Sequence, residues 1–261
     1  MSSPLLGSTD AHLWPLLAAA GFVAGVINAI AGGGSLLSFP ALLLTGMSAV
    51  TANATNTLAL WPGSLSSVYA YKKQIGEERH RAWVLAVPSM VGGLAGSWLL
   101  LHTSERAFRA VVPWLILFAC ALLSLQGPIA RWLKQRQGLG GTSSVPAFLW
   151  IAQLLIAVYG GYFGAGIGIL MLAGMAIFLP DTMQHANALK VLFACLINGI
   201  AAIYFLGMNA ASLPESALMA VTSIVGGYAG AHLAQRMPAR VMRVVVITFG
   251  LVVAVRLFYK G

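Results

Sequence analysis

The chain carries little negative charge, and none of it lies inside an apolar run. Only 8% of its 261 residues are charged, and six are acidic. The six occupy connectors or the edges of apolar runs: Asp10, Glu77, Glu78, Glu105, Asp181 and Glu215. Ionisable residues within membrane segments mark ion pathways and proton relays. Their placement here disfavours a sodium site or a carboxylate proton relay.

Cysteine and nucleotide-binding motifs are equally scarce. The two cysteines, Cys120 and Cys195, lie in apolar runs without histidine or cysteine at ligand spacing, so we expect buried small residues and no metal site. The glycines Gly32, Gly33 and Gly34 lack the Gly-Lys-Ser/Thr ending of a phosphate-binding loop. This argues against ATP-driven transport, and we expect no cofactor.

Hydrophobic residues dominate, at 59% of the chain with a mean hydropathy of +0.86. This composition predicts an all-α polytopic membrane protein with the lipid bilayer as a partner. The net charge of +9 resides in short connectors, where membrane orientation explains it, so no nucleic-acid partner is expected. Residues 1–12 have no basic segment ahead of the first apolar run, so we expect a tail and no cleaved signal peptide.

Apolar runs of about 20 residues, the length of a membrane span, recur along the chain. They cover roughly 13–31, 51–71, 82–101, 107–125, 147–163, 186–206, 216–233 and 241–258. The runs 35–45 and 169–179 are about half as long. Because a helix rises about 1.5 Å per residue, we expect these two as half-helices or arms of re-entrant hairpins.

The second half of the chain repeats the first at a shift of 134 residues. Matching positions include Ala31/Ala165, Gly32/Gly166, Gly34/Gly168, Asn53/Asn187, Gly92/Gly226, Gly96/Gly230, Arg106/Arg240 and Arg109/Arg243. The repeat predicts two tandem copies of a four-segment unit, 13–125 and 147–261, joined by a linker at 126–146. Gly92 with Gly96, and Gly226 with Gly230, are small-xxx-small pairs that predict close helix packing.

The connectors indicate that the copies have opposite orientation. Positive residues mark the cytoplasmic side. They fill the 72–81 connector of the first copy, are absent from the equivalent 207–215, and return at Arg236 to Arg243. This switch favours inverted repeats, with a broken or re-entrant helix giving each copy an odd number of crossings. The N-terminus is then outside and the 126–146 linker cytoplasmic.

Broken apolar segments at matching positions of two halves point to a transporter's binding site. The first break contains Gly32, Gly33, Gly34 and Ser35, and the second contains Gly164, Gly166 and Gly168. If Ser35 caps a helix start, backbone N–H groups there can bind an anion. The alternative is that the glycines only permit tight packing or a turn.

Lys190 lies four residues inside the run 186–206, on the helical face of Asn187. A lysine at the centre of a membrane helix costs about 2.5–3.5 kcal/mol and usually marks a pathway or a partner. No acidic residue is near in sequence, so a substrate anion is a candidate partner. The alternative is that the side chain reaches the membrane interface.

Other polar side chains flank the breaks. Asn53, Thr55, Asn56 and Asn187 are candidate substrate contacts, or they cap helices and join them. His185 lies two residues before Asn187 and can titrate near neutral pH. It is either a proton carrier or a membrane-edge histidine without function.

Several motifs together resemble the first signature of the TauE/SafE sulfite exporter family, also called TSUP transporters. They are Gly21-Phe22 to Gly25, Ala31 to Ser35, Phe39-Pro40 and Asn53 to Asn56. The likeness extends from about residue 13 to 258. It implies a duplicated permease that moves sulfite, sulfonates, thiosulfate or related anions, often as a bacterial exporter. The second copy differs from the first at two of these positions: it has Leu189 where the first has Thr55, and Lys190 where the first has Asn56. The two half-sites therefore cannot contribute equally.

Taken together, these features predict a transporter, not an enzyme, that exports a small sulfur-containing oxyanion across the bacterial inner membrane by secondary transport or uniport. Sulfite is the leading candidate. A passive anion channel would use the same residues and differ in its kinetics. A membrane enzyme acting on a sulfur compound or lipid is a further alternative, but the polar residues that flank the breaks include no nucleophile–base pair.

Overall fold

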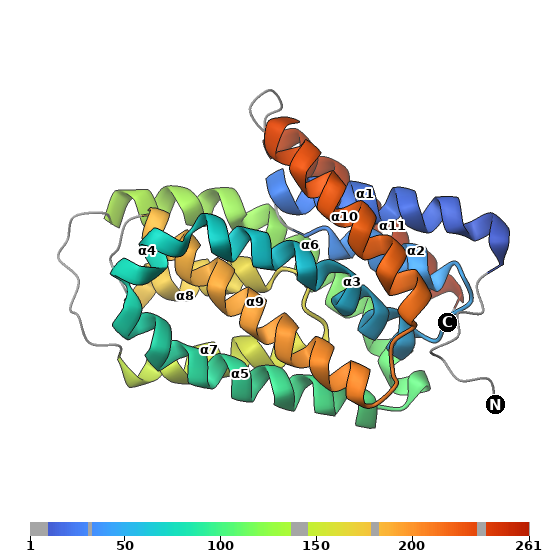
Figure 1. The fold of residues 1–261 in the computed structure, drawn as a ribbon, viewed down its shortest axis with the longest axis horizontal. Helices are drawn as coiled ribbons and strands as arrows, with labels where there is room; N and C mark the ends of the chain where they lie inside the picture. Colours follow the sequence, from blue (N-terminus) through green and yellow to red (C-terminus); the bar gives the residue numbers. More distant parts are fainter. Residues whose placement is uncertain (1–9, 31–32, 137–145, 179–182, 234–238, 261) are drawn as a thin grey trace.

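The computed structural model describes residues 10–30, 33–136, 146–178, 183–233 and 239–260, and every regular element among them is a helix (Figure 1). The first copy contains η2 (Ala11–Leu13), α1 (Trp14–Ile30), α2 (Ser35–Leu43), α3 (Ala49–Ala70), α4 (Lys72–Glu77), α5 (Arg79–His102) and α6 (Glu105–Arg136). The second contains α7 (Ala147–Tyr162), α8 (Ile167–Phe178), α9 (Met183–Gly207), α10 (Leu213–Leu233) and α11 (Ala239–Lys260).

The apolar runs predicted the helices. Each long run falls on one helix, and the two short runs fall on α2 and α8, which have 9 and 12 residues. Two elements were not expected: the short connector helix α4 and the single turn η2. Helix α6 also continues through Arg136, so it extends well into the stretch 126–146 that was expected as a linker.

The exterior of the bundle suits a lipid environment. Among the described residues, the helical segments Arg79–His102, Glu105–Ile129 and Gln184–Gly207 are both long enough and apolar enough to cross a membrane. Large apolar side chains are exposed on the outside, for example Trp83 at 68% and Leu155 at 64%. Water would disfavour so much exposed apolar surface, whereas hydrocarbon covers it without cost. The predicted all-α polytopic membrane protein is therefore confirmed.

The helices of the two copies pack in reciprocal pairs. Helix α1 packs along α10, and its counterpart α7 packs along α5. Likewise α10 contacts α3 while α5 contacts α9. The equivalent helices α3 and α9 contact each other, as do α6 and α11. Each copy therefore completes its packing only with helices of the other.

Glycines permit the closest of these contacts. A Cβ on Gly96 of α5 would lie 2.0 Å from the carbonyl oxygen of Val158, and one on Gly226 of α10 would lie 2.0 Å from that of Phe22. A Cβ on Gly92 would lie 2.6 Å from the Leu154 carbonyl oxygen. The predicted packing role is confirmed for these three glycines. The side-chain surroundings of Gly230 lie outside the described part of the chain.

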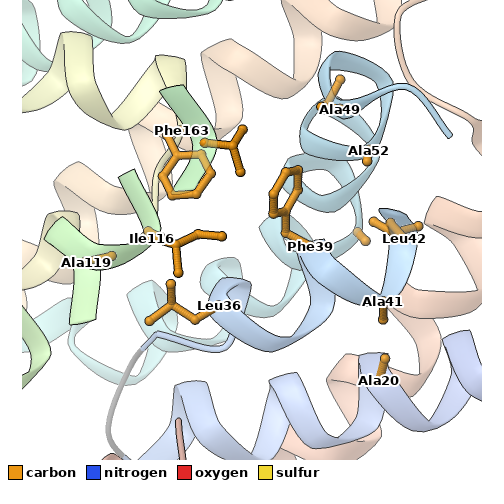
Figure 2. Packing of buried hydrophobic residues seen from close by; sticks show 14 of the residues in the cluster. Ala20, Leu36, Phe39, Ala41, Leu42, Ala49, Ala52, Ile116, Ala119 and Phe163 are labelled. Atoms are coloured by element: carbon orange, nitrogen blue, oxygen red, sulfur yellow. The ribbon is translucent and has the colours of Figure 1, made fainter. Parts of the chain in front are cut away.

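Apolar side chains fill the middle of the bundle beside the broken helices. Phe39 of α2 meets Phe163 edge to face, with ring centroids 5.6 Å apart (Figure 2). Leu36 of α2 and Ile116 of α6 belong to the same buried cluster. The cysteines Cys120 and Cys195 are buried and free, which confirms their interpretation as small core residues.

Candidate functional site

The first break separates α1 from α2. Gly33 has φ +91°, a conformation that glycine adopts without strain. The backbone N–H of Gly34 donates to Oδ1 of Asn28 at 2.7 Å. Gly34, without a side chain, occupies the capping position, and Ser35 is the first residue of the helix. The prediction that Ser35 caps α2 is therefore wrong, because Asn28 from the end of α1 reaches the exposed amide instead. Gly32 lies outside the described residues.

The amides of this first break are already in use. Leu36 N–H donates to the Gly33 carbonyl and Leu37 N–H to the Gly34 carbonyl, both at 3.0 Å. Together with the Gly34 amide, these account for three of the N–H groups that the sequence offered to an anion. The first break thus presents less hydrogen-bonding capacity than predicted.

The second break separates α7 from α8. Gly164 and Gly166 both have φ +81°, so this turn uses glycine at two positions for its backbone conformation. The Tyr159 hydroxyl donates to the carbonyl oxygen of Ala165 at 2.7 Å and braces the turn. Helix α8 then begins at Ile167. Gly164 and Gly166 therefore form a turn, and their role in anion binding stays a prediction.

Both breaks meet the same turn of α6. A Cβ on Gly33 would lie 3.6 Å from the methyl carbons of Leu123. A Cβ on Gly166 would lie 3.3 Å from Cδ1 of Leu122 and 3.7 Å from Cα of Ala119. The two breaks are therefore level with each other along α6, although Gly33 and Gly166 lie 133 positions apart in sequence.

Lys190 of α9 lies against the second break. A Cβ on Gly168 would lie 3.2 Å from Cδ of Lys190, and the Lys190 ammonium donates to Oδ1 of Asn187 at 3.0 Å. Among the described residues, no carboxylate pairs with this ammonium. A positive charge in an apolar bundle therefore has only a neutral amide as its hydrogen-bond partner.

Asn56, the counterpart of Lys190 in the first copy, joins helices α3 and α2. It is buried, and its Oδ1 accepts a hydrogen bond from the Ser38 hydroxyl at 2.5 Å. That hydroxyl also lies 3.2 Å from the carbonyl oxygen of Gly34. Ser38 was not predicted, since a single serine within an apolar run carries no distinctive sequence signal.

Thr55 and Asn53 both bind backbone groups of the second copy. The Thr55 hydroxyl oxygen accepts the N–H of Ser212 at 2.9 Å, and its carbonyl accepts the Ser216 hydroxyl at 3.3 Å. Asn53 Nδ2 donates to the Tyr162 carbonyl at 2.9 Å. These contacts agree with the alternative that such residues join helices. Asn53 Oδ1, however, is buried without a hydrogen-bond partner.

His185 of α9 contacts the connector of the first copy. Its Nε2 lies 2.9 Å from Glu77 Oε2, and its Nδ1 lies 3.4 Å from Glu78 Oε1. Glu78 also pairs with Arg81 at 2.9 Å. This network fastens the start of α9 to α4, which gives His185 a structural partner. A role in proton transfer stays a prediction.

Two acidic residues stabilise helix starts. Glu105 accepts hydrogen bonds from the amides of Ala49 (2.6 Å) and Val50 (3.1 Å) at the N-terminus of α3. Glu215 lies in the first turn of α10, as its edge position implied, but it is fully buried and accepts the Ser212 hydroxyl. The spacing Ser212-x-x-Glu215 is a capping-box signal that could have revealed this contact. Asp181 lies outside the described residues.

The described residues contain no group of three or more His, Cys, Asp or Glu side chains that could hold a metal ion. Near the breaks, the described polar groups are instead one ammonium, several carboxamides, the hydroxyls of Ser38 and Tyr159, and backbone groups. Such a set can bind a small polar ion. It contains no nucleophile–base pair for a covalent reaction.

Comparisons with known proteins agree with this picture. Residues 17–257 match the family model described as "Sulfite exporter TauE/SafE". A probable membrane transporter protein of Haemophilus influenzae is 28% identical over 95% of both chains. The probable membrane transporter protein YfcA of Escherichia coli is 27% identical, covering 92% of this chain and 87% of the relative. A Sinorhizobium relative, probable membrane transporter protein ORF9, is 26% identical over 94% and 92%. No solved structure matches the chain significantly.

Proposed function

Because the chain belongs to the TauE/SafE sulfite exporter family of membrane transporters, we propose that it exports a small sulfur-containing oxyanion across the bacterial inner membrane. Sulfite is the leading candidate, with organosulfonate or thiosulfate as related substrates. Export proceeds by secondary transport or uniport. A membrane potential that is negative inside favours the exit of an anion by about 2.3 kcal/mol per charge per 100 mV, so export needs no further energy source.

The observation that carries the proposal is Lys190 at the second break. A lysine within a membrane helix is costly unless it has a partner, and its partner among the described residues is the neutral carboxamide of Asn187. A bound oxyanion supplies the missing negative charge. The start of α8, which follows Gly164 and Gly166 and contains Gly168, adds the positive end of a helix dipole beside it.

Carboxamides complete the anion site in this proposal. Asn187 Oδ1 is taken by Lys190, so its Nδ2 is the group left to donate to a substrate oxygen. The same holds for Asn56, whose Oδ1 is taken by Ser38. The first break, with Gly33, Gly34 and Ser35, contributes less, because the amides of Gly34, Leu36 and Leu37 already have acceptors.

We further propose that the two copies are inverted in the membrane. The reciprocal packing of α1 on α10 and α7 on α5 supports a twofold relation between them. In Figure 1, α1 and α3 begin at the right and run left, whereas α7 and α9 begin at the left and run right. Together with the switch of positive connectors, this arrangement supports an N-terminus outside and a cytoplasmic linker at 126–146.

Sulfite flux in proteoliposomes tests the function. Purified protein should release entrapped radiolabelled sulfite with saturable kinetics, and the rate should rise when the potential drives anions outward. Liposomes without the protein are the control. Flux that never saturates would indicate the passive channel instead. No flux of sulfite, sulfonate or thiosulfate above the control would refute the proposal.

A further inference from the structure

Oxygen atoms converge beside Gly164, at the point where α7 ends. A Cβ built on Gly164 would have two atoms of other residues within 4 Å, and both are oxygens: the carbonyl oxygen of Gly160 at 3.1 Å and Oδ1 of Asn198 at 3.7 Å. The position that a Cβ of residue 164 would take therefore has two hydrogen-bond acceptors as its nearest neighbours.

Asn53 brings a third oxygen to the same helix end. Its Nδ2 donates to the carbonyl oxygen of Tyr162, the last residue of α7, which fixes the carboxamide there. The side chain is 1% exposed, and its Oδ1 has no hydrogen-bond partner. Leaving a buried acceptor unpaired costs about 1–3 kcal/mol, so this oxygen is open to a hydrogen-bond donor or a cation.

The backbone at this end is also rich in acceptors. The last carbonyls of a helix have no amide of the same helix to accept from, and they carry the negative end of its dipole. Phe163 and Gly164 both donate to the Tyr159 carbonyl. Among the described residues, no backbone hydrogen bond from outside the helices reaches the carbonyl oxygens of Gly160 or Gly161. Hard cations prefer such oxygen ligands.

We propose that Asn53 Oδ1, Asn198 Oδ1 and the Gly160 carbonyl form a binding site for a sodium ion at the C-terminal end of α7. The site uses neutral oxygens only, so the scarcity of acidic residues in the membrane does not exclude it. One helix break then serves two ions, the cation at the end of α7 and the anion beside Lys190 at the start of α8. Broken helices of transporters divide their ends between ions in this way.

The site is asymmetric between the copies. The first-copy counterparts of Gly164 and Asn198, at a shift of 134, are Ile30 and Ser64. The Ser64 hydroxyl donates to the Trp61 carbonyl of its own helix. Asn28, the counterpart of Tyr162, uses its Oδ1 for the Gly34 amide. The duplicated fold therefore provides one such sodium site and not two.

Sodium binding to the purified protein, measured without sulfite, tests the inference. Melting temperature is followed while NaCl replaces choline chloride at constant ionic strength, because a ligand that binds only the folded state raises it. We expect a saturable rise for wild type and for Thr222→Val, whose hydroxyl bonds only to carbonyls of its own helix.

Two substitutions at Asn198 give opposite expectations. Asn198→Leu keeps the size and removes the oxygen, so sodium affinity should fall about tenfold or more. Asn198→Asp adds a charge, so affinity should rise about tenfold. A gain in affinity cannot come from misfolding, which keeps the test decisive if the leucine variant proves unstable.

No sodium-specific rise in wild type, stabilisation by potassium alone, or an unchanged sodium affinity in Asn198→Asp would overturn the site. Because sulfite is absent from this measurement, its result is independent of the proposed export function. A protein that binds sodium but moves no sulfite would support this inference and refute the export proposal. A protein that moves sulfite but binds no sodium would refute this inference and support the export proposal.

Discussion

At the scale of single residues, the polar side chains beside the breaks fall into two groups: those with atoms left to bind a substrate, and those whose atoms already bind other helices. Within the described part of the chain, Lys190 has only a neutral partner. The carboxamide oxygens of Asn187 and Asn56 are taken, which leaves their nitrogens to donate. Thr55 is different, because its hydroxyl oxygen accepts the amide of Ser212, just before α10, and its carbonyl accepts the hydroxyl of Ser216 in α10. We infer that Thr55 holds helices together and does not contact the substrate.

Substitution of Thr55 by valine tests that distinction. The valine keeps the shape but leaves the Ser212 amide unpaired, which should lower stability by about 1–3 kcal/mol. The KM for sulfite should stay at the wild-type value. Thermal melting and proteoliposome kinetics measure the two effects. Thr57→Val is the matched control, since its hydroxyl bonds only to the carbonyl of Asn53 in its own helix. A raised KM with wild-type stability would return Thr55 to the binding site.

Gly96 is a second residue whose role can be isolated. Gly96→Ala would force a methyl group to within 2.0 Å of the Val158 carbonyl oxygen, so α5 and α7 must separate. Overpacking of this kind costs about 1–3 kcal/mol or more, and the melting temperature should fall. Gly76→Ala in α4 is the control, because a Cβ there meets nothing within 4 Å. Equal melting temperatures for the two variants would argue against the close α5–α7 contact.

At the scale of elements, the hydrophobic runs were enough to predict every long helix, because a membrane span needs about 20 apolar residues whatever it packs against. The helix α4 was missed, since its six residues contain mostly polar side chains. The predicted capping residue of α2, Ser35, was wrong because a side chain from another helix, Asn28 of α1, accepts the Gly34 amide instead. The burial of Glu215 also depends on packing that the sequence does not reveal.

Helix α3 depends on a carboxylate from another element. Glu105, the first residue of α6, accepts the amides of Ala49 and Val50. Removing it with Glu105→Ala should destabilise the protein by about 1–2 kcal/mol, the range for a charge that caps a helix N-terminus. Glu105→Gln should retain part of this stability through its amide oxygen. If melting shows both variants equal to wild type, the carboxylate does not stabilise α3.

At the scale of the whole molecule, two copies that each lack a complete set of partners assemble into one bundle. Their breaks meet one turn of α6, at Gly33 and Gly166, which the repeat in the sequence could align but not bring together in space. We propose that inversion of the copies brings these two matching interruptions to the same height from opposite sides.

Cysteine accessibility tests this topology. In a background with Cys120→Ala and Cys195→Ala, a Ser3→Cys probe should react with a membrane-impermeant thiol reagent in intact cells. A Ser143→Cys probe, in the linker, should react only after permeabilisation. Reaction of both probes from the same side would contradict an odd number of crossings in the first copy.

The central claim is that Lys190 supplies the positive charge for an anionic substrate. The most direct measurement is the initial rate of sulfite efflux from proteoliposomes containing wild type, Lys190→Ala, Lys190→Arg or Lys73→Ala, at equal amounts of folded protein. Lys73 is an exposed connector residue and serves as the control. We expect Lys190→Ala to lose at least about tenfold in rate, since charge-assisted contacts contribute about 1.5–3 kcal/mol. Lys190→Arg should retain more, and Lys73→Ala should match wild type. A wild-type efflux rate from Lys190→Ala would contradict the account.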